Sequence, residues 1–193
     1  MSSDPDSLVK AIFDNTIAAH SSFADRGRPS VVAAAQAISR ALGSGRKLLA
    51  FGNGGSAGDA EHLVAELVGR FELERRALPA ISLTCDPSVV TAIANDYGYS
   101  TVFARQIEAL GNPGDVAFGI STSGESPNVV AGLQAAKAAG LRTIALTGRD
   151  GGSVGRAADI HVNVPDHSTA RVQEVHRTLM HVMCEVIEED ANA

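Results

Sequence analysis

The sequence predicts a doubly wound α/β fold, in which three layers (αβα) enclose a five-stranded parallel sheet of the flavodoxin or Rossmann-like kind. Three observations support this prediction. Five short apolar runs recur along the chain, helical patterns separate most of them, and small polar loops follow two of them. Ligands of such folds bind at the carboxyl ends of the strands, so we expect these two loops to lie at one edge.

Two amphipathic helical patterns, at residues 6–25 and 30–42, precede the first expected strand. We therefore predict a single domain, with residues 1–44 as an N-terminal helical arm and residues 45–193 as the α/β core with a C-terminal helix. Helices outside a core need a cover for their apolar faces, and a partner subunit is the usual one.

The remaining elements follow in chain order. The expected strands are residues 47–51, 80–83, 115–120, 142–146 and 160–164. The expected helices carry residues 59–66, 87–94, 100–110, 129–139 and 169–189. Asp86 and Pro87 are a typical N-cap and first-turn pair. We expect residues 95–98 to form a turn.

Composition limits the class of protein. The chain has 193 residues, 45% of them hydrophobic, and no run of eighteen apolar residues, so we expect a buried core and no membrane span. The polar, acidic N-terminus is unlike a signal peptide, which predicts a cytoplasmic protein. The net charge of −6, scarce aromatics and lack of a basic cluster argue against a nucleic-acid surface. Cys85 and Cys184 form no Cys-x-x-Cys unit, so we expect no disulfide.

A glycine-rich turn, Gly52–Ser56, follows the first apolar run and opens into a helical pattern. Backbone amides at a helix start attract anions, and Asn53 and Ser56 add side-chain hydrogen bonds. The turn is therefore a candidate phosphate site. The alternative is an ordinary strand-to-helix turn with a serine cap.

His62 and Glu66 stand four residues apart in the following helix, so they share one face, with Asp59 on the same side. A histidine and a carboxylate at this spacing can bind one metal ion or act as an acid/base pair. A solvated helix face with a chance pair is the alternative.

A second loop, residues 121–126, follows the third strand and holds four hydroxyl side chains at a helix start. These are Ser121, Thr122, Ser123 and Ser126. Such a loop can hold a phosphate, whereas the alternative is a hydrophilic loop with redundant helix caps.

The last helix carries a polar group in a largely apolar sequence: Gln173, Glu174, His176 and His181. Glu174 and His181 are seven residues apart and nearly eclipsed, whereas Gln173 and His181 are offset by roughly 80°. The pattern alone leaves open which of the two shares a site with His181.

Together with Asn95-Asp96 and Thr147-Gly148, these motifs resemble a sugar isomerase (SIS) domain, and most closely the bacterial phosphoheptose isomerases. The resemblance covers nearly the whole chain. It implies interconversion of D-sedoheptulose 7-phosphate and D-glycero-D-manno-heptose 7-phosphate, early in heptose biosynthesis for lipopolysaccharide and related glycans. It also implies a homotetramer with active sites at subunit interfaces, and bound zinc.

The resemblance assigns roles residue by residue. It implies one zinc per subunit, held by His62, Glu66, Gln173 and His181, with Glu66 also the general base and His181 the general acid. Gln173 is thereby preferred to Glu174. The implied substrate contacts, besides Glu66, are Asn53, Gly54, Gly55, Ser56, Asn95, Asp96, Ser121, Thr122, Ser123, Ser126 and Gln173, with the four hydroxyl residues holding the phosphate.

A relative with the same fold offers the alternative function: a non-catalytic regulator that associates with the DnaA replication initiator. That regulator lacks the acid at the Glu66 position and the histidine at the His181 position. This chain has both, which favours the enzyme. A dinucleotide-binding domain is excluded, because the first loop lacks G-x-G-x-x-G and no acidic residue ends the second strand.

Overall fold

The computed structural model describes residues 4–192, and a five-stranded parallel sheet lies at its centre, as predicted. The strand order is β2-β1-β3-β4-β5. The strands are β1 (Leu48–Gly52), β2 (Ala80–Ser82), β3 (Val116–Ser121), β4 (Arg142–Gly148) and β5 (Ile160–Val164). β2 and β3 lie on opposite sides of β1, so the strand order reverses there and opens a crevice at the carboxyl ends of β1 and β3.

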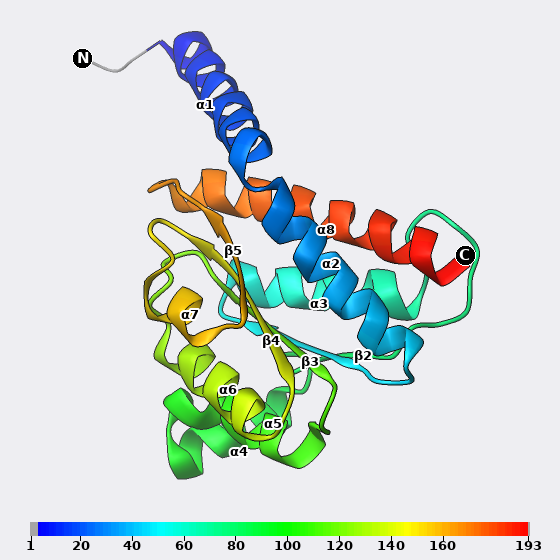
Figure 1. The fold of residues 1–193 in the computed structure, drawn as a ribbon. Helices are drawn as coiled ribbons and strands as arrows, with labels where there is room; N and C mark the ends of the chain where they lie inside the picture. The colour runs from blue at the N-terminus through cyan, green and yellow to red at the C-terminus, as the bar shows by residue number, and fades with distance from the viewer. Residues whose placement is uncertain (1–3, 193) are drawn as a thin grey trace.

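Helices cover both faces of the sheet (Figure 1). One layer holds α2 (Arg28–Gly43), α3 (Gly55–Val68) and α8 (Thr169–Asn192). The opposite layer holds α4 (Pro87–Tyr97), α5 (Val102–Leu110), α6 (Pro127–Ala138) and α7 (Gly152–Ala157), with the short 3-10 turn η1 (Tyr99–Thr101) between α4 and α5. α1 (Pro5–Arg26) projects beyond the first layer.

The apolar strand sequences explain the two cores. Leu48 and Ala50 of β1 belong to the hydrophobic cluster under α2, α3 and α8. Leu49 and Phe51 belong to the cluster under α5 and α6. Successive side chains of a strand point to opposite faces, so a parallel strand covered on both faces needs a continuous apolar run.

The prediction of a turn at residues 95–98 is wrong for residues 95–97, because α4 continues to Tyr97. The helix ends at Gly98, whose φ of +86° suits glycine and breaks the helical path. Asn95 and Asp96 therefore lie in the last turn of a helix. The sequence also gave no indication of α7, which has six residues and two glycines.

The two N-terminal helices differ in how they are covered. α2 buries Val31, Ile38 and Leu42 within the chain, in the cluster that also contains α8 residues. The expectation that both helices need a partner is therefore wrong for α2. α1 buries only Phe23 and leaves an apolar stripe more than 40% exposed: Leu8, Val9, Ile12, Phe13 and Ile17.

α1 and α8 are the longest helices in the described chain, with 22 and 24 residues. Across residues 4–192, no helix combines the length and apolar character needed to cross a bilayer.

Candidate active site

α3 and α8 run side by side in the same direction, and their facing side chains meet at three successive levels (Figure 1). Gly55 meets Gln173 at the first level, and Asp59 pairs with Arg177 at 2.7 Å at the second. At the third level, His62 meets His181. The constant offset of 118 or 119 residues shows that the two helices keep one register over this whole length.

The third level brings together three of the predicted site residues. Nε2 of His62 lies 2.8 Å from Nε2 of His181 and 3.3 Å from Oε1 of Glu66. One ligand atom from each of the three residues lies within 4.8 Å of the others, and all three side chains are half-buried. The i, i+4 spacing on α3 and the register with α8 together create this group.

The group fits a zinc ion in its chemistry and spacing. Two imidazoles and one carboxylate are ligands typical of catalytic zinc sites. Atoms bound at about 2.0–2.1 Å in a tetrahedron lie roughly 3.4 Å apart, close to the observed 2.8 and 3.3 Å. Only a small spreading of the two imidazoles would be needed.

The electrostatics favour a neutral, metal-binding imidazole at His62. Burial lowers the pKa of His62, the positive charge of Arg177 lowers it further, and Glu66 only partly opposes them. Burial also raises the pKa of Asp59, against the effect of Arg177. Metal ligation requires the unprotonated imidazole, so the shift at His62 acts in the right direction.

Gln173 lies at the first level and not with the other three candidate ligands. Its amide packs so closely on Gly55 that a Cβ there would clash with it. Along α8, eight residues separate Gln173 from His181, a rise of about 12 Å. Gln173 also borders a cavity of about 520 Å³ shared with Asp59 and Arg177.

Glu174 points away from this group. Its carboxylate accepts a hydrogen bond from Thr16 of α1 at 2.9 Å and pairs with Arg171. The alternative that the sequence left open, Glu174 beside His181, therefore does not occur in the single chain.

The glycine turn after β1 is tied to the first turn of α6, which directly follows the hydroxyl loop. Asn53 and Asn128 exchange two side-chain hydrogen bonds of 2.8 Å, and the Tyr99 hydroxyl donates to Oδ1 of Asn53 at 2.9 Å. Gly54, with φ of +57°, precedes α3, and the Ser56 side chain is buried. The glycine turn, η1 and the start of α6 are thus joined at the crevice.

The hydroxyl side chains of the second loop converge. Ser121 Oγ lies 2.8 Å from Ser126 Oγ and 3.3 Å from Ser123 Oγ. Ser126 is the N-cap residue of α6, yet its hydroxyl makes no cap hydrogen bond. α6 begins with Pro127, which has no N–H, and the amides of Val129 and Val130 donate to the Ser126 carbonyl, so the three converging hydroxyls are the main donors that this loop offers an anion. Thr122 belongs to the same turn and is half-buried.

Asn95 and Asp96 hydrogen bond to each other at 2.8 Å and are exposed. Within residues 4–192, no hydrogen bond connects either side chain to the glycine turn or to the hydroxyl loop. Their proposed substrate contact thus has no direct geometric support in the single chain.

Sequence reasoning missed several contacts of the site. Arg177 stands four residues from both Gln173 and His181, so the helical spacing could have revealed it. The ring of Phe71 lies 5.2 Å from that of His181, and Asn128 fixes Asn53. These two contacts join residues distant in sequence, and no local pattern signals them.

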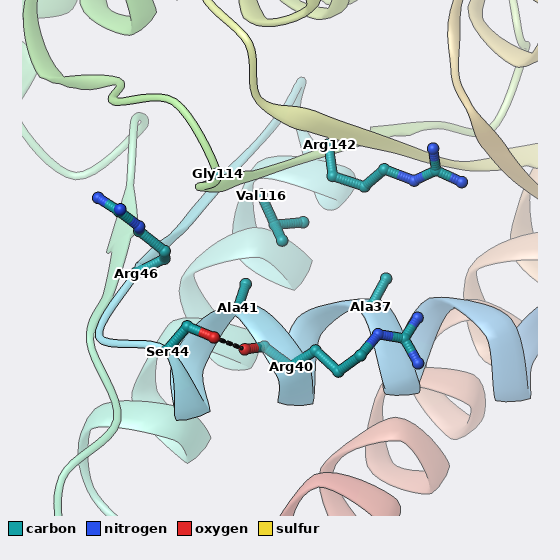
Figure 2. Close-up of a pocket in the computed structure, with 8 residues that line it drawn as sticks. All are labelled: Ala37, Arg40, Ala41, Ser44, Arg46, Gly114, Val116 and Arg142. Carbon is teal, nitrogen blue, oxygen red and sulfur yellow. Dashed lines mark hydrogen bonds between the residues drawn. The ribbon is translucent and has the colours of Figure 1, made fainter.

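A second hollow, of about 370 Å³, lies at the opposite edge of the sheet, where β1, β3 and β4 begin (Figure 2). Arg40, Arg46 and Arg142 border it. Figure 2 shows Arg46 pointing away from the other two, so the three guanidinium groups do not converge on one ligand position. This hollow lacks the geometry of a built anion site.

Known proteins confirm the family that the motifs indicate. A family model described as the SIS domain matches residues 13–148. The phosphoheptose isomerase of Geotalea daltonii is 56% identical over 160 residues, covering 83% of each chain. That of Aquifex aeolicus is 53% identical over 181 residues, covering 94% of this chain and 95% of its own.

The fold comparison agrees. The structure of phosphoheptose isomerase from Neisseria gonorrhoeae superposes with a TM-score of 0.92 at 43% identity, covering 96% of this chain and all of that one. With this extent of likeness in sequence and structure, the chain belongs to the phosphoheptose isomerases, the SIS-domain family of sugar-phosphate isomerases.

Proposed function

We propose that this isomerase interconverts D-sedoheptulose 7-phosphate and D-glycero-D-manno-heptose 7-phosphate. The observation that carries the proposal is the meeting of one carboxylate and two imidazoles, from two different helices, within 4.8 Å. Relatives named phosphoheptose isomerase, more than 50% identical, supply the substrate class.

The chemistry requires a base and an acid near adjacent carbons. In the ketose-to-aldose direction, Glu66 would remove a proton from C1 and later return it to C2. The intermediate of this reaction would be a cis-enediol. His181 would move a proton between the oxygens on C2 and C1. A carboxylate and an imidazole are the usual groups for such transfers.

The hydroxyl loop would hold the phosphate at the far end of the open-chain sugar. The hydroxyls of Ser121, Ser123 and Ser126 converge at the start of α6, which suits a phosphate. Thr122 and the glycine turn Gly52–Ser56 would complete this end. Binding energy from the phosphate would then position the reacting carbons.

We propose one zinc per subunit, held by His62, Glu66 and His181, with Gln173 as the fourth ligand. A divalent ion bound there would polarise the carbonyl and hydroxyl oxygens of the substrate. Gln173 lies two helical turns from His181 in one chain, so its amide must leave Gly55 or be supplied by a second copy. Asn53 and Asp96 would contact sugar hydroxyls.

We also propose a cytoplasmic homotetramer with sites at subunit interfaces, which provides the product for heptose biosynthesis. The exposed apolar stripe of α1 supports an assembly, because such stripes on a helix usually bind another surface.

The experiment is direct. Purified protein is incubated with sedoheptulose 7-phosphate and the sugars are analysed. The aldose 7-phosphate should form until equilibrium, and its absence with folded, zinc-loaded protein would reject this substrate.

A further inference from the structure

A buried carboxylate at the end of α8 anchors the loop that follows α3. The side chain of Glu188 is 1% exposed. It accepts hydrogen bonds from three consecutive backbone amides, those of Phe71, Glu72 and Leu73, at 2.8, 2.9 and 2.9 Å. Three amides directed at one carboxylate fix the path of this loop.

Arg75, in the same loop, joins Glu188 to the end of α3. Its Nε lies 3.2 Å from Oε1 of Glu188, and its side chain is also 1% exposed. Its guanidinium donates to the backbone carbonyl of Glu66 at 2.7 Å and to that of Leu67 at 2.9 Å. The last carbonyls of a helix have no partner within the helix, so Arg75 caps the turn of α3 that carries Glu66.

The loop also reaches His181. Because Glu188 holds the backbone amide of Phe71, the Phe71 ring lies against His181, with centroids 5.2 Å apart and planes inclined by 33°. His181 and Glu188 are seven residues apart on one face of α8. Glu188 thus contacts both halves of the site indirectly, Glu66 through Arg75 and His181 through Phe71.

We propose that Glu188 and Arg75 are positioning residues of the isomerase site, which fix Glu66 and His181 relative to each other. The inference rests on the proposed function, in which these two groups hold zinc and move protons. Neither Glu188 nor Arg75 touches the substrate in this scheme.

Stability alone does not account for this arrangement. Replacing a buried ion pair by apolar residues is often neutral or stabilising, so a fold needs no such pair for its stability. Burial by itself would raise the pKa of Glu188, but the three amides and Arg75 outweigh it and lower the pKa. Both carboxylate oxygens of Glu188 accept backbone amides, so this side chain is a charged anchor that fixes geometry more strictly than apolar packing.

The chain offers a matched control at the other edge of the sheet. Asp115 is 1% exposed, accepts from the amides of Lys47 and Asn112 at 3.0 and 2.8 Å, and pairs with Lys47 Nζ at 2.6 Å. Like Glu188, it is a buried carboxylate bound by backbone amides and one cationic side chain. Among the described residues it makes no contact with the site. Glu188→Gln and Asp115→Asn should both lower the melting temperature, by on the order of 10 °C.

Two readouts separate positioning from stability, both measured well below each melting temperature. Glu188→Gln should lower kcat by about 10- to 100-fold with KM changed by less than about threefold. It should also weaken zinc binding by about 10- to 100-fold in a chelator competition. Asp115→Asn should leave kcat and zinc affinity at wild-type values.

The inference is overturned if Glu188→Gln matches Asp115→Asn in kcat and in zinc affinity. If Glu188→Gln does not fold, Phe71→Leu decides, because it keeps the amide anchor and removes the ring from His181. That variant should lower kcat with little change in melting temperature, and unchanged kcat and zinc affinity would overturn the proposal. If the wild type binds zinc and does not isomerise the sugar, the proposed function is rejected. The zinc competition alone then tests the positioning role of Glu188. A wild type with neither property overturns both.

Discussion

Glu66 combines the two properties that a general base in this site needs. Its carboxylate lies 3.3 Å from His62 Nε2, and its side chain is 21% exposed, so substrate can reach it. A carboxylate that removes a proton from carbon can exchange that proton with water before returning it. This distinguishes the enediol route from a hydride shift between C1 and C2.

Glu66→Gln should lower turnover by about 10²–10⁴-fold or more, because the amide keeps the shape of the side chain and cannot accept the proton. Wild-type turnover in D₂O should place deuterium at C2 of the aldose, as seen by NMR, and the variant should show no exchange while still binding a phosphate sugar. Near-normal activity in the variant would remove Glu66 from the base role. Full retention of substrate hydrogen in the wild type would indicate the hydride shift.

His62→Ala should lose bound metal and keep the fold, because His62 lies between the other two candidate ligands. Elemental analysis of protein purified without chelator should give about one zinc per subunit for the wild type and far less for the variant. Circular dichroism provides the control for folding. An unchanged zinc content in the variant would exclude His62 from the ligand set.

His176 makes stability depend on pH. It is fully buried, donates from Nε2 to the carbonyl of Thr147 at 3.0 Å, and burial lowers its pKa to about 4. The unfolded chain takes up the proton near pH 6.5 and the folded chain only near pH 4, so the unfolding free energy falls as pH drops through this window.

Between pH 7.5 and pH 5, this histidine should therefore cost the wild type about 2 kcal/mol of stability. Urea unfolding of wild type and His176→Gln at both pH values measures the difference. Other lowered pKa values, such as those of His62 and His161, remain in both proteins and cancel. Equal losses in the two proteins would contradict the assignment to His176.

At the scale of elements, the register between α3 and α8 determines which polar side chains meet. Asp59 is 4% exposed and its Oδ2 has no hydrogen-bond partner among the described residues, so the contact with Arg177 is its main compensation. A carboxylate that loses its only cation in a buried position is strongly destabilising, whereas removal of both partners is much less so.

Arg177→Met alone should therefore reduce the unfolding free energy by about 2–4 kcal/mol, and Arg177→Met combined with Asp59→Asn should recover part of this loss. A double-mutant cycle by chemical denaturation gives the coupling energy. A coupling near zero would mean that the second level of contacts does not hold the two helices in register.

The fold was predictable from sequence because its signals are local. The buried strands β1 and β3 are continuous apolar runs, and Asp86-Pro87 does begin α4 as expected. α7 was missed because six residues with two glycines give no helical period. Strand ends differ from the prediction by one or two residues, because β1, β3 and β4 continue past the apolar run into Gly52, Ser121 and Thr147-Gly148.

The site was predictable only in part, since half of it depends on contacts distant in sequence. The spacing of His62 and Glu66 places them together on any helix, but their meeting with His181 depends on the register of α8. Which of Gln173 and Glu174 faces α3 depends on α1, because the Thr16 hydroxyl hydrogen bonds to the Glu174 carboxylate and holds it on the side of α1. The loop anchor at Glu188 lies more than 110 residues from the amides that it binds.

At the scale of the whole molecule, α1 projects from the domain and its apolar stripe has no cover within the described chain (Figure 1). Arg171, Glu174 and Thr178 of α8 hydrogen bond to Ile12, Thr16 and His20 of α1, so the helix is held in place while its apolar stripe stays exposed. A fixed, apolar, exposed helix suits association with further copies of the chain.

We expect a homotetramer in light scattering, and Phe13→Asp with Ile17→Asp should dissociate it, because two charges would then be buried in the contact. Lys10→Gln, on the same helix at a residue paired with Asp14, is the control that should keep the assembly. A wild type that stays monomeric at micromolar concentration would contradict the assembly and the shared site with it.

α8 follows every strand in the chain, and this order affects biosynthesis. All five strands and α3 precede the 24 residues of α8 in the chain, and translation of those residues takes on the order of a few seconds. Until α8 emerges, the nascent chain lacks the helix that completes the hydrophobic cluster containing Phe118 and Ile144, and it lacks His181. A message truncated near codon 165 would yield a protein with every strand and no active site, and its uncovered sheet would make it a substrate for chaperones and proteases.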